Sequence, residues 1–317
     1  MLLEDWESRQ RAPRKDDGER GPNGSSGSNG SPKRVLTAVV LAVALVVVVG
    51  VGAVAVKLRS HHGSTPVAMK LHVVTRHTAA PTLAPPKSWR ETFDASFSGT
   101  TLDTKVWSTC YPGAQPTGCT NYGNKADKED EWYLTSQDQV SGGALHLTAQ
   151  RVPTPGFAQS GAAQQYSCRS GMVTTYGSLD FQYGFLQVTA KIPFGTGLWP
   201  ALWLAAANGK WPPEVDLLEH WHTESFGKVY FHPLGGARQG GPVSMPDLSS
   251  GYHTYTLSWT KSRIVWYYDG TQVLSSTSYI PQQQMYLIMN LADDALGPGS
   301  CTGSLDIKSV KLWQPSN

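Results

Sequence analysis

Three carboxylates lie within six residues of one another, at Glu214, Asp216 and Glu219. Side chains two positions apart on a β-strand share a face, so Glu214 and Asp216 are expected to point the same way. Glu219 lies five positions after Glu214 and would face the opposite side of an unbroken strand. One extra residue, a β-bulge near Leu217 or Leu218, restores the parity. We therefore expect all three acids to line one surface.

Acids held this close together have a chemical use. Like charges repel, which raises the pKa of at least one carboxyl group. Glycoside hydrolysis needs one ionised carboxylate to attack the anomeric carbon and one carboxylic acid to protonate the leaving oxygen. An aspartate between them can hold a proton and tune both neighbours. The alternative is an amphipathic helix or a metal-binding strand that carries ordinary surface acids.

The chain contains 11 tryptophans, which is many for its length. A flat aromatic ring can stack on the face of a sugar while its polar edge forms hydrogen bonds. We expect this role for Trp199, and Trp132 and Trp221 are further candidates. For three other tryptophans we expect core packing instead: Trp203, Trp259 and Trp313.

From Trp89 onward, short segments alternate apolar and polar residues with a period of two and are separated by Gly, Asn, Asp and Pro. The clearest are residues 144–150, 185–192, 252–259, 264–268, 285–291 and 305–313. Such segments are typical of antiparallel strands, and Asp269-Gly270 is typical of a two-residue hairpin turn. The pattern predicts an all-β sandwich of two antiparallel sheets.

Composition divides the chain into four regions. Residues 1–34 are polar and rich in Gly and Ser, and we expect a disordered cytoplasmic tail. Residues 35–56 are 22 uncharged, mostly apolar residues, enough for a helix that spans a hydrocarbon core of about 30 Å. Residues 57–87 are predicted to form an extended stalk. Residues 88–317 would form an extracellular domain on a single-pass cell-membrane protein.

A cleaved signal peptide is the alternative to a membrane anchor. Ala53-Val54-Ala55 fits a small-residue cleavage site, and the protein would then be secreted. Both interpretations export the domain. From Ser88 to Asn317 there are 14 Lys and Arg against 18 Asp and Glu, a difference of −4. This balance leaves no basic face for a nucleic acid.

All four cysteines lie on the exported side, at Cys110, Cys119, Cys168 and Cys301. An even number in an oxidising compartment favours two disulfides, and their spacing does not resemble a zinc site. Three pairings are open. We favour Cys110–Cys119, which closes a short loop rich in Pro and Gly, and this leaves Cys168–Cys301 as a long-range bridge.

At several motifs the chain resembles glycoside hydrolase family 16, the laminarinase and lichenase group. The resemblance runs from about Ser88 to Gln314, and its motifs occur in the family's order. They are Phe93–Asp103, Tyr183-Gly184-Phe185 with Ala190–Pro193, Gly197–Leu204, the E-x-D-x-x-E segment Glu214–Glu219, the residues His253, Tyr255 and Trp259, and Asn290-Leu291-Ala292.

The resemblance implies a concanavalin A-like jelly roll and a retaining mechanism. Glu214 would be the nucleophile, Glu219 the general acid and then base, and Asp216 an assisting group. Retaining enzymes hold their two carboxyl groups about 5–5.5 Å apart. With the tryptophans above, the expected substrate-binding residues are Trp199, Glu131, Trp132, Trp221, His232 and Asn290.

The chain also departs from the family pattern. Many members bind a structural calcium through an acid in the first strand and an aspartate in the last. Asp306 fits the last strand, but Ser96 stands where the first acid would be, with Asp94 nearby. We expect no metal and no other cofactor. After the three acids comes His220-Trp221 in place of the commoner tyrosine, which bears on the choice of substrate.

These observations favour a monomeric endo-glycosidase acting on β-1,3 or mixed β-1,3/1,4 glucan. Two alternatives stay open. One is a membrane-tethered, non-catalytic glycan-binding module on the same fold. The other is a family relative that acts on galactans or as a transglycosylase.

Overall fold

The structure is a computed structural model that describes residues 83–111, 129–158, 160–221, 226–294 and 301–316. The predicted cytoplasmic tail, the predicted membrane helix and most of the predicted stalk lie outside these ranges. Within them, no helix has the length and apolar character needed to cross a membrane. Residues 83–87 belong to the predicted stalk, and here Leu83 contacts the domain: its carbonyl accepts a 2.8 Å hydrogen bond from Gln187 Nε2.

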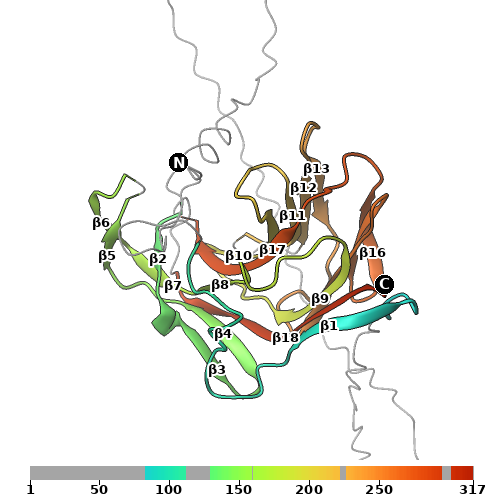
Figure 1. Cartoon of the computed structure of the whole chain (residues 1–317). Coiled ribbons are helices and arrows are strands. Elements are labelled where there is room, and N and C mark those ends of the chain that lie inside the picture. The colour runs from blue at the N-terminus through green and yellow to red at the C-terminus, as the bar shows by residue number, and fades with distance from the viewer. Residues whose placement is uncertain (1–82, 112–128, 159, 222–225, 295–300, 317) are drawn as a thin grey trace, which may run out of the picture. The chain divides into compact units, whose positions relative to one another are not determined.

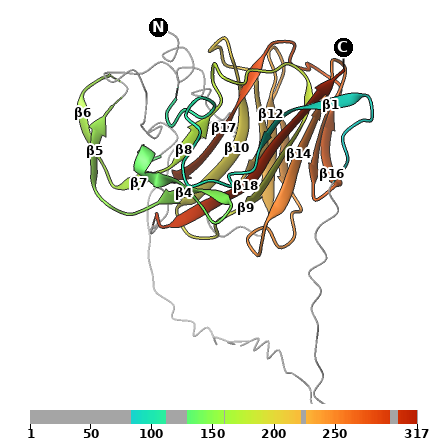
Figure 2. The same cartoon turned by 60° about the horizontal axis from the view of Figure 1, so that its bottom comes forward.

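Two antiparallel sheets form the layers of the domain (Figures 1 and 2). Along the larger sheet the strands follow the order β16 (Thr271–Ser276), β15 (Ile264–Tyr268), β14 (His253–Trp259), β9 (Gly184–Lys191), β18 (Gly303–Pro315), β4 (Ala144–Ala149) and β3 (Asp138–Ser141), and β1 (Trp89–Ala95) pairs with the second half of β18. The six-stranded sheet has the order β13 (Gln239–Val243), β12 (Gly227–His232), β11 (Glu214–Glu219), β10 (Leu198–Ala206), β17 (Met285–Asp293) and β8 (Met172–Thr174).

Smaller elements lie beside these sheets. The short strand β2 (Glu131–Tyr133) pairs in parallel with β7 (Cys168–Ser170), and a 3-10 turn follows it at Thr135–Gln137. The hairpin of β5 (Thr154–Phe157) and β6 (Ala163–Tyr166) lies at the left of Figure 1. In both overall views it is on the opposite side of the domain from β16.

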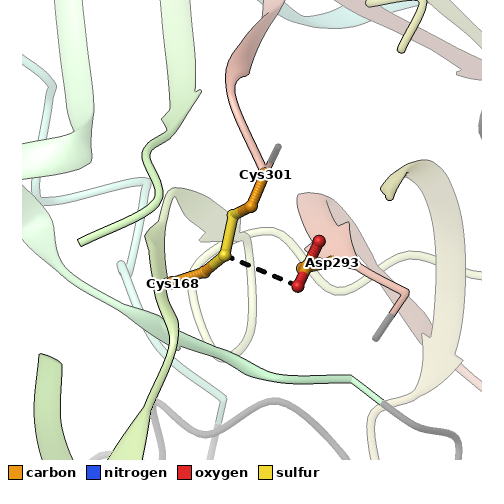
Figure 3. A group of neighbouring side chains, drawn as sticks. All are labelled: Cys168, Asp293 and Cys301. Carbon is orange, nitrogen blue, oxygen red and sulfur yellow. Dashed lines mark hydrogen bonds between the residues drawn. A yellow bond between two sulfur atoms is a disulfide. The ribbon is translucent and has the colours of Figure 1, made fainter. Parts of the chain in front are cut away.

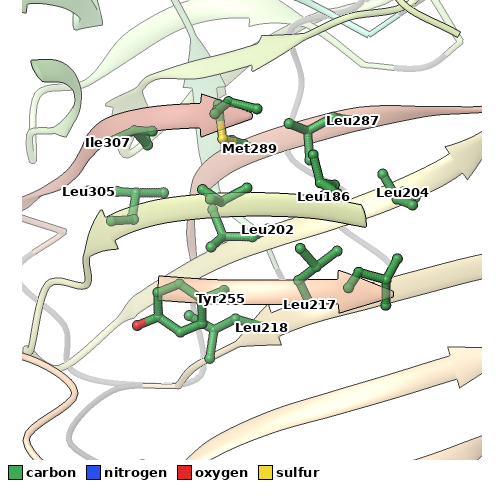
Figure 4. Packing of buried hydrophobic residues seen from close by; sticks show 14 of the residues in the cluster. Leu186, Leu202, Leu204, Leu217, Leu218, Tyr255, Leu287, Met289, Leu305 and Ile307 are labelled. Carbon is green, nitrogen blue, oxygen red and sulfur yellow. The ribbon is translucent and has the colours of Figure 1, made fainter. Parts of the chain in front are cut away.

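The core lies between the two sheets and is formed by the inward side of each strand. Leu186 of the larger sheet packs in one cluster with Leu202, Leu204 and Leu287 of the six-stranded sheet (Figure 4). All four side chains are at most 1% exposed. The residues that alternate with them along each strand have their side chains on the opposite face of the sheet, as expected for a sandwich. The predicted all-β sandwich is therefore confirmed.

The strands predicted from alternation are present within a residue or two of their expected bounds. The hairpin at Asp269-Gly270 is confirmed as well. It joins β15 to β16 through two residues whose φ angles are 46° and 77°. Two residues with positive φ define the type of turn that matches the twist of the flanking strands. Glycine at the second position adopts this φ without a steric penalty.

Two of the tryptophans expected in the core have different surroundings. Trp259 is fully buried, as predicted, and its Nε1 donates a hydrogen bond of 3.2 Å to the carbonyl of Pro281. Trp313 is only half-buried, so the prediction of core packing is wrong for it. Its neighbour Leu312 takes the inward position on β18, and Trp313 instead covers Phe185 with ring centres 6.0 Å apart.

One predicted disulfide is confirmed. Cys168 at the start of β7 is bonded to Cys301, just before β18, with a Cα–Cα distance of 6.3 Å. Figure 3 shows the carboxylate of Asp293, at the end of β17, beside this bond, 3.5 Å from Cys168 Sγ. The disulfide thus joins the start of β7 to the start of β18, beside the end of β17. The predicted partner of Cys110, Cys119, lies outside the described residues.

Candidate active site

Strand β11 carries the three acids and is bulged at Leu217. Its pairing with β10 matches Leu202 with Leu218 and the next residue of β10 with Asp216, so Leu217 has no ladder partner. The pairing with β12 shifts at the same place. The predicted bulge is therefore confirmed. It places all three acids on the face of the six-stranded sheet that points away from the core.

The bulge is supported from the opposite sheet. Trp266 on β15 is 1% exposed, and its Nε1 donates a 2.9 Å hydrogen bond to the main-chain carbonyl of Asp216. A bulge disturbs the ladder locally, and a buried carbonyl left without a partner is costly. Leu217 and Leu218 are both buried in the core beside it. Core residues thus stabilise the bulged backbone that places the three acids on one face.

Glu219 is held by a group of aromatic side chains. Trp199 Nε1 donates a 3.1 Å hydrogen bond to Glu219 Oε1. The ring of Trp221 lies 4.8 Å from that of Trp199, and Lys228 Nζ lies 3.8 Å from the centre of the Trp221 ring. Burial and the negative charge of Glu214 raise the pKa of Glu219 to about 8. Glu219 therefore keeps its proton at neutral pH.

Glu214 contacts a tryptophan and a histidine through different oxygens. Trp211 Nε1 donates a 3.0 Å hydrogen bond to Oε2, and His232 Nε2 lies 3.4 Å from Oε1. His232 is the cross-strand partner of Glu214 on β12, so the expectation that it faces the site is confirmed. Burial and the positive charge of Arg238 lower the pKa of His232 to about 4. Its imidazole is thus neutral at neutral pH.

Asp216 is the deepest of the three acids, with 2% exposure. Burial, followed by the charges of Glu214 and Glu219, raises its pKa well above the ordinary aspartate value. Among the described residues its Oδ2 has no hydrogen-bond partner, and His232 Nε2 lies 3.9 Å away. The environment therefore favours a protonated, uncharged Asp216 between the two glutamates.

Aromatic side chains line the face that carries the acids. The register places Trp203 beside Asp216 on β10 and Tyr230 beside it on β12. Trp203 is half-buried and lies on this face, so the prediction that it packs in the core is wrong. Alternate residues of β10 point to opposite faces, and Leu202 and Leu204 take the core side. The acids thus lie between rings that could stack on a sugar.

Sequence comparison identifies the family. Residues 124–300 match the family model described as glycosyl hydrolases family 16, which is more than half of the chain. The chain belongs to this family.

Individual relatives of this family 16 chain agree with that match. It is 31% identical over 221 residues to the endo-1,3-1,4-beta-glycanase ExsH of Rhizobium meliloti (strain 1021), covering 65% of this chain and 46% of that protein. It is 30% identical over 120 residues to the beta-1,3-glucan-binding protein of Penaeus monodon, covering 32% and 33%. The chain therefore spans less than half the length of these two relatives.

The fold is shared with solved family 16 structures. The catalytic domain of an endo-1,3-beta-glucanase (laminarinase) from Thermotoga petrophila RKU-1 aligns with a TM-score of 0.61 and 23% identity. The alignment covers 72% of this chain and 99% of that domain. This likeness agrees with the sandwich of two antiparallel sheets described above and with the expected jelly roll.

Among the six expected substrate-binding residues, three lie at the triad: Trp199, Trp221 and His232. The prediction that Glu131 lines the cleft is wrong, because its side chain is 0% exposed. Its Oε2 accepts a 2.9 Å hydrogen bond from the main-chain nitrogen of Asp293. Burial raises the pKa of Glu131 to about 7. Glu131 thus acts inside the domain, where it helps to hold the end of β17.

Trp132 and Asn290 have contacts within the domain, and their role in substrate binding stays a prediction. Trp132 packs against Phe157 and Tyr166 of the β5–β6 hairpin, with ring centres 6.2 Å and 5.3 Å away. Asn290 is 4% exposed, and both ends of its amide are engaged. It accepts from Trp203 Nε1 at 2.9 Å and donates to the hydroxyl of Tyr133 at 3.0 Å. Asn290 therefore fixes the position of the Trp203 ring through this hydrogen bond.

Among the residues of the site that were not predicted from the sequence are Trp211, Lys228 and Arg238. Arg238 lies with its guanidinium carbon 4.5 Å from the centre of the Tyr230 ring. Trp211 lies only three residues before Glu214, and that proximity was an available signal. The positions of the other two depend on the register between β11 and β12 and on the loop after β12, which alternation alone does not reveal.

Asp94 and Asp306, the two acids considered for a calcium site, contact basic side chains and lie at different positions along the β1–β18 pair. Asp306 accepts a 2.7 Å hydrogen bond from His146 Nδ1, and Asp94 pairs with Lys311 Nζ at 2.6 Å. Asp94 lies opposite Lys311 in the β1–β18 register, five positions along β18 from Asp306, so the two carboxylates do not converge. Ser96 is exposed just beyond the end of β1.

Proposed function

We propose that this family 16 chain is a retaining endo-glycosidase that hydrolyses β-1,3 or mixed β-1,3/1,4 glucan. One observation carries the proposal. A single bulge brings Glu214 onto the same face as a protonated Glu219, whose Oε1 accepts a hydrogen bond from the half-buried ring of Trp199. The printed activity of the Rhizobium relative supports the substrate class.

The proposed reaction has two steps. Glu214 attacks the anomeric carbon while Glu219 gives its proton to the leaving glycosidic oxygen, so that a glycosyl ester forms as the C–O bond breaks. Glu219, now ionised, then takes a proton from water, whose oxygen displaces Glu214 and releases the sugar. An uncharged Asp216 adds no negative charge beside Glu214 and can donate a hydrogen bond to it.

We further propose that the domain works outside the cell as a monomer. The support is the apolar run at residues 35–56, which would anchor the chain with the domain exported, or would be removed as a signal peptide. The confirmed Cys168–Cys301 disulfide is consistent with an oxidising compartment.

A second candidate is a tethered glycan-binding module without catalysis. It is favoured by the similarity to a protein named for glucan binding. A binding module, however, gains nothing from three acids at one bulge, because two of them are held in an environment that disfavours their charged form. The relatives that act on galactans or transfer sugars remain outcomes of the substrate test.

The test is product release by the purified chain from laminarin, barley mixed-linkage glucan, agarose, carrageenan and xyloglucan. Wild type, Glu219→Ala and Glu214→Gln are compared on each polysaccharide. We expect one β-glucan to be cleaved by the wild type, with turnover lost in both variants and oligosaccharide binding kept by Glu214→Gln. Binding without cleavage by the wild type would favour the glycan-binding module instead.

A further inference from the structure

Three side chains of the site form a second arrangement that the hydrolytic reaction does not need. His232 Nε2 lies 3.4 Å from Glu214 Oε1 and 3.9 Å from Asp216 Oδ2. All three atoms lie within 4.8 Å of one another. Two carboxylate oxygens and one imidazole nitrogen thus converge on a single point, from two adjacent strands.

The spacing of these atoms resembles that of zinc ligands. Zn²⁺ binds imidazole nitrogen and carboxylate oxygen at about 2.0–2.2 Å, usually with tetrahedral geometry. Two ligand atoms of such a tetrahedron lie roughly 3.4 Å apart. The distance from His232 to Glu214 already has this value, and the distance to Asp216 is 0.5 Å longer. Small side-chain rotations would complete the set.

The buried carboxylate of Asp216 is a second, independent indication of a ligand. Its Oδ2 has no hydrogen-bond partner among the described residues, although the residue is only 2% exposed. A buried polar atom in this state is uncommon and calls for an explanation. The oxygen lies 3.9 Å from His232 Nε2, and ligand atoms of His232, Glu214 and Asp216 lie within 4.8 Å of one another. A metal ion between these three atoms, bound with release of the Asp216 proton to solvent, would satisfy it.

Glu214 is held in place by a hydrogen bond, and the three side chains differ in their exposure to solvent. Trp211 donates to Oε2 of Glu214, and the other oxygen of that carboxylate lies beside His232. The exposed fractions of the side chains fall from 23% for His232 to 12% for Glu214 and 3% for Asp216. An ion would therefore enter past the histidine, and a water molecule could complete its coordination on that side.

We propose that Glu214, Asp216 and His232 bind one Zn²⁺ ion and that this ion inhibits the enzyme. The imidazole nitrogen favours zinc over magnesium and calcium, which take oxygen ligands. The inhibition rests on the proposed function, in which Glu214 is the nucleophile: bound zinc would occupy its carboxylate, so zinc and the glycan would compete. The positive charge of Arg238 nearby weakens the affinity but leaves the three ligands in place.

The first experiment measures inhibition. The metal-free full chain hydrolyses its preferred glucan with increasing ZnCl₂, and each variant is scaled to its own metal-free rate. We expect zinc inhibition that added substrate relieves, with no inhibition by MgCl₂ or CaCl₂ at equal concentration. His232→Gln should raise the half-inhibitory zinc concentration at least tenfold. His146→Gln, which alters a histidine beside a single carboxylate, should leave it unchanged. Equal zinc sensitivity of wild type and His232→Gln would overturn the site.

The second experiment measures binding and does not depend on turnover. Calorimetric titration of the same proteins with ZnCl₂ should show one equivalent fewer for His232→Gln than for wild type and His146→Gln. The histidines that all three proteins share contribute equally and cancel, and His146→Gln controls for the loss of one histidine outside the site. A lost equivalent in a protein that cleaves no glycan would support the metal site and reject the proposed hydrolysis. Equal stoichiometry in an active enzyme would reject the metal site alone.

Discussion

Lys228 lies over the ring of Trp221, with its Nζ atom 3.8 Å from the ring centre. Lys228 is also the cross-strand partner of Glu219. These contacts link Lys228 back to Glu219, because the ring of Trp221 packs on that of Trp199 and Trp199 donates a hydrogen bond to Glu219. One lysine therefore acts on the general acid in two ways, through its charge and through the rings that hold the carboxyl group.

The charge of Lys228 lowers the pKa of Glu219 and so opposes the larger effect of burial. Replacing Lys228 by Met keeps an aliphatic side chain and removes the charge. The pKa of Glu219 should then rise, Glu219 should stay protonated to higher pH, and the alkaline limb of the kcat profile should move upward in pH. Lys228→Arg, which keeps the charge, should leave the limb near its wild-type position. A limb that moves down in Lys228→Met would contradict the assignment.

The wild-type profile itself follows from Glu219. A general acid must carry its proton, and the pKa of Glu219 is raised to about 8, so kcat should fall as the pH rises above about 8. Glu219→Gln should lower kcat on a glucan by roughly 10²–10⁴-fold, the usual contribution of acid–base catalysis.

A substrate with a reactive leaving group provides the control for this prediction. A dinitrophenyl glycoside needs little help from an acid to form its glycosyl ester. The rate of the phenolate burst should therefore differ little between Glu219→Gln and wild type, whereas the rate of glucan hydrolysis should differ greatly. If Glu219→Gln lowers the rate equally on both substrates, Glu219 does not act as the general acid.

The bulge shows how far the sequence could predict this site. The spacing of Glu214, Asp216 and Glu219 is incompatible with an unbroken period of two, and only an inserted residue places them together. That reasoning needed no knowledge of the neighbouring strands, and the register of β11 confirms it. Likewise, Asp269-Gly270 is a local signal, and its turn is present as predicted.

Other residues were misplaced because their surroundings come from distant parts of the chain. Both faces of β10 are apolar or aromatic, so alternation did not show that Trp203 faces the site. All nine positions of β17 are buried, which hides the role of Asn290. The burial of Glu131 depends on β2 lying beside β7 and the end of β17, contacts that join residues more than 30 positions apart.

The contact between Trp266 and the bulge leads to a prediction about activity. Trp266→Phe keeps most of the buried ring but leaves the carbonyl of Asp216 without its donor. An unsatisfied buried acceptor costs about 1–3 kcal/mol, so the midpoint of thermal unfolding should fall. The bulge should also loosen, and kcat should fall with it.

Trp259→Phe is the matched control for this variant. Trp259 is equally buried in the same sheet, and its Nε1 donates to the carbonyl of Pro281, away from β11. This variant should lose similar stability but keep kcat at temperatures well below unfolding. Equal loss of kcat in both variants would show that activity follows general stability, and that the bulge needs no support from Trp266.

Asp138 on β3 predicts a pH dependence of stability that is separate from catalysis. It is 8% exposed, and burial, only partly opposed by a backbone hydrogen bond from Met172, raises its pKa to about 8. Its folded pKa exceeds the unfolded value of 3.8, so its contribution to stability is full below about pH 4 and is lost as the pH rises to 8. Asp138→Asn should therefore raise the free energy of unfolding relative to wild type at pH 8, by an amount on the order of 1 kcal/mol or more.

At pH 4 the free energies of unfolding of Asp138→Asn and wild type should be nearly equal. Denaturant unfolding at both values checks this, with Asp103→Asn as the exposed control, and an unchanged difference between the two pH values would rule out Asp138 as the source.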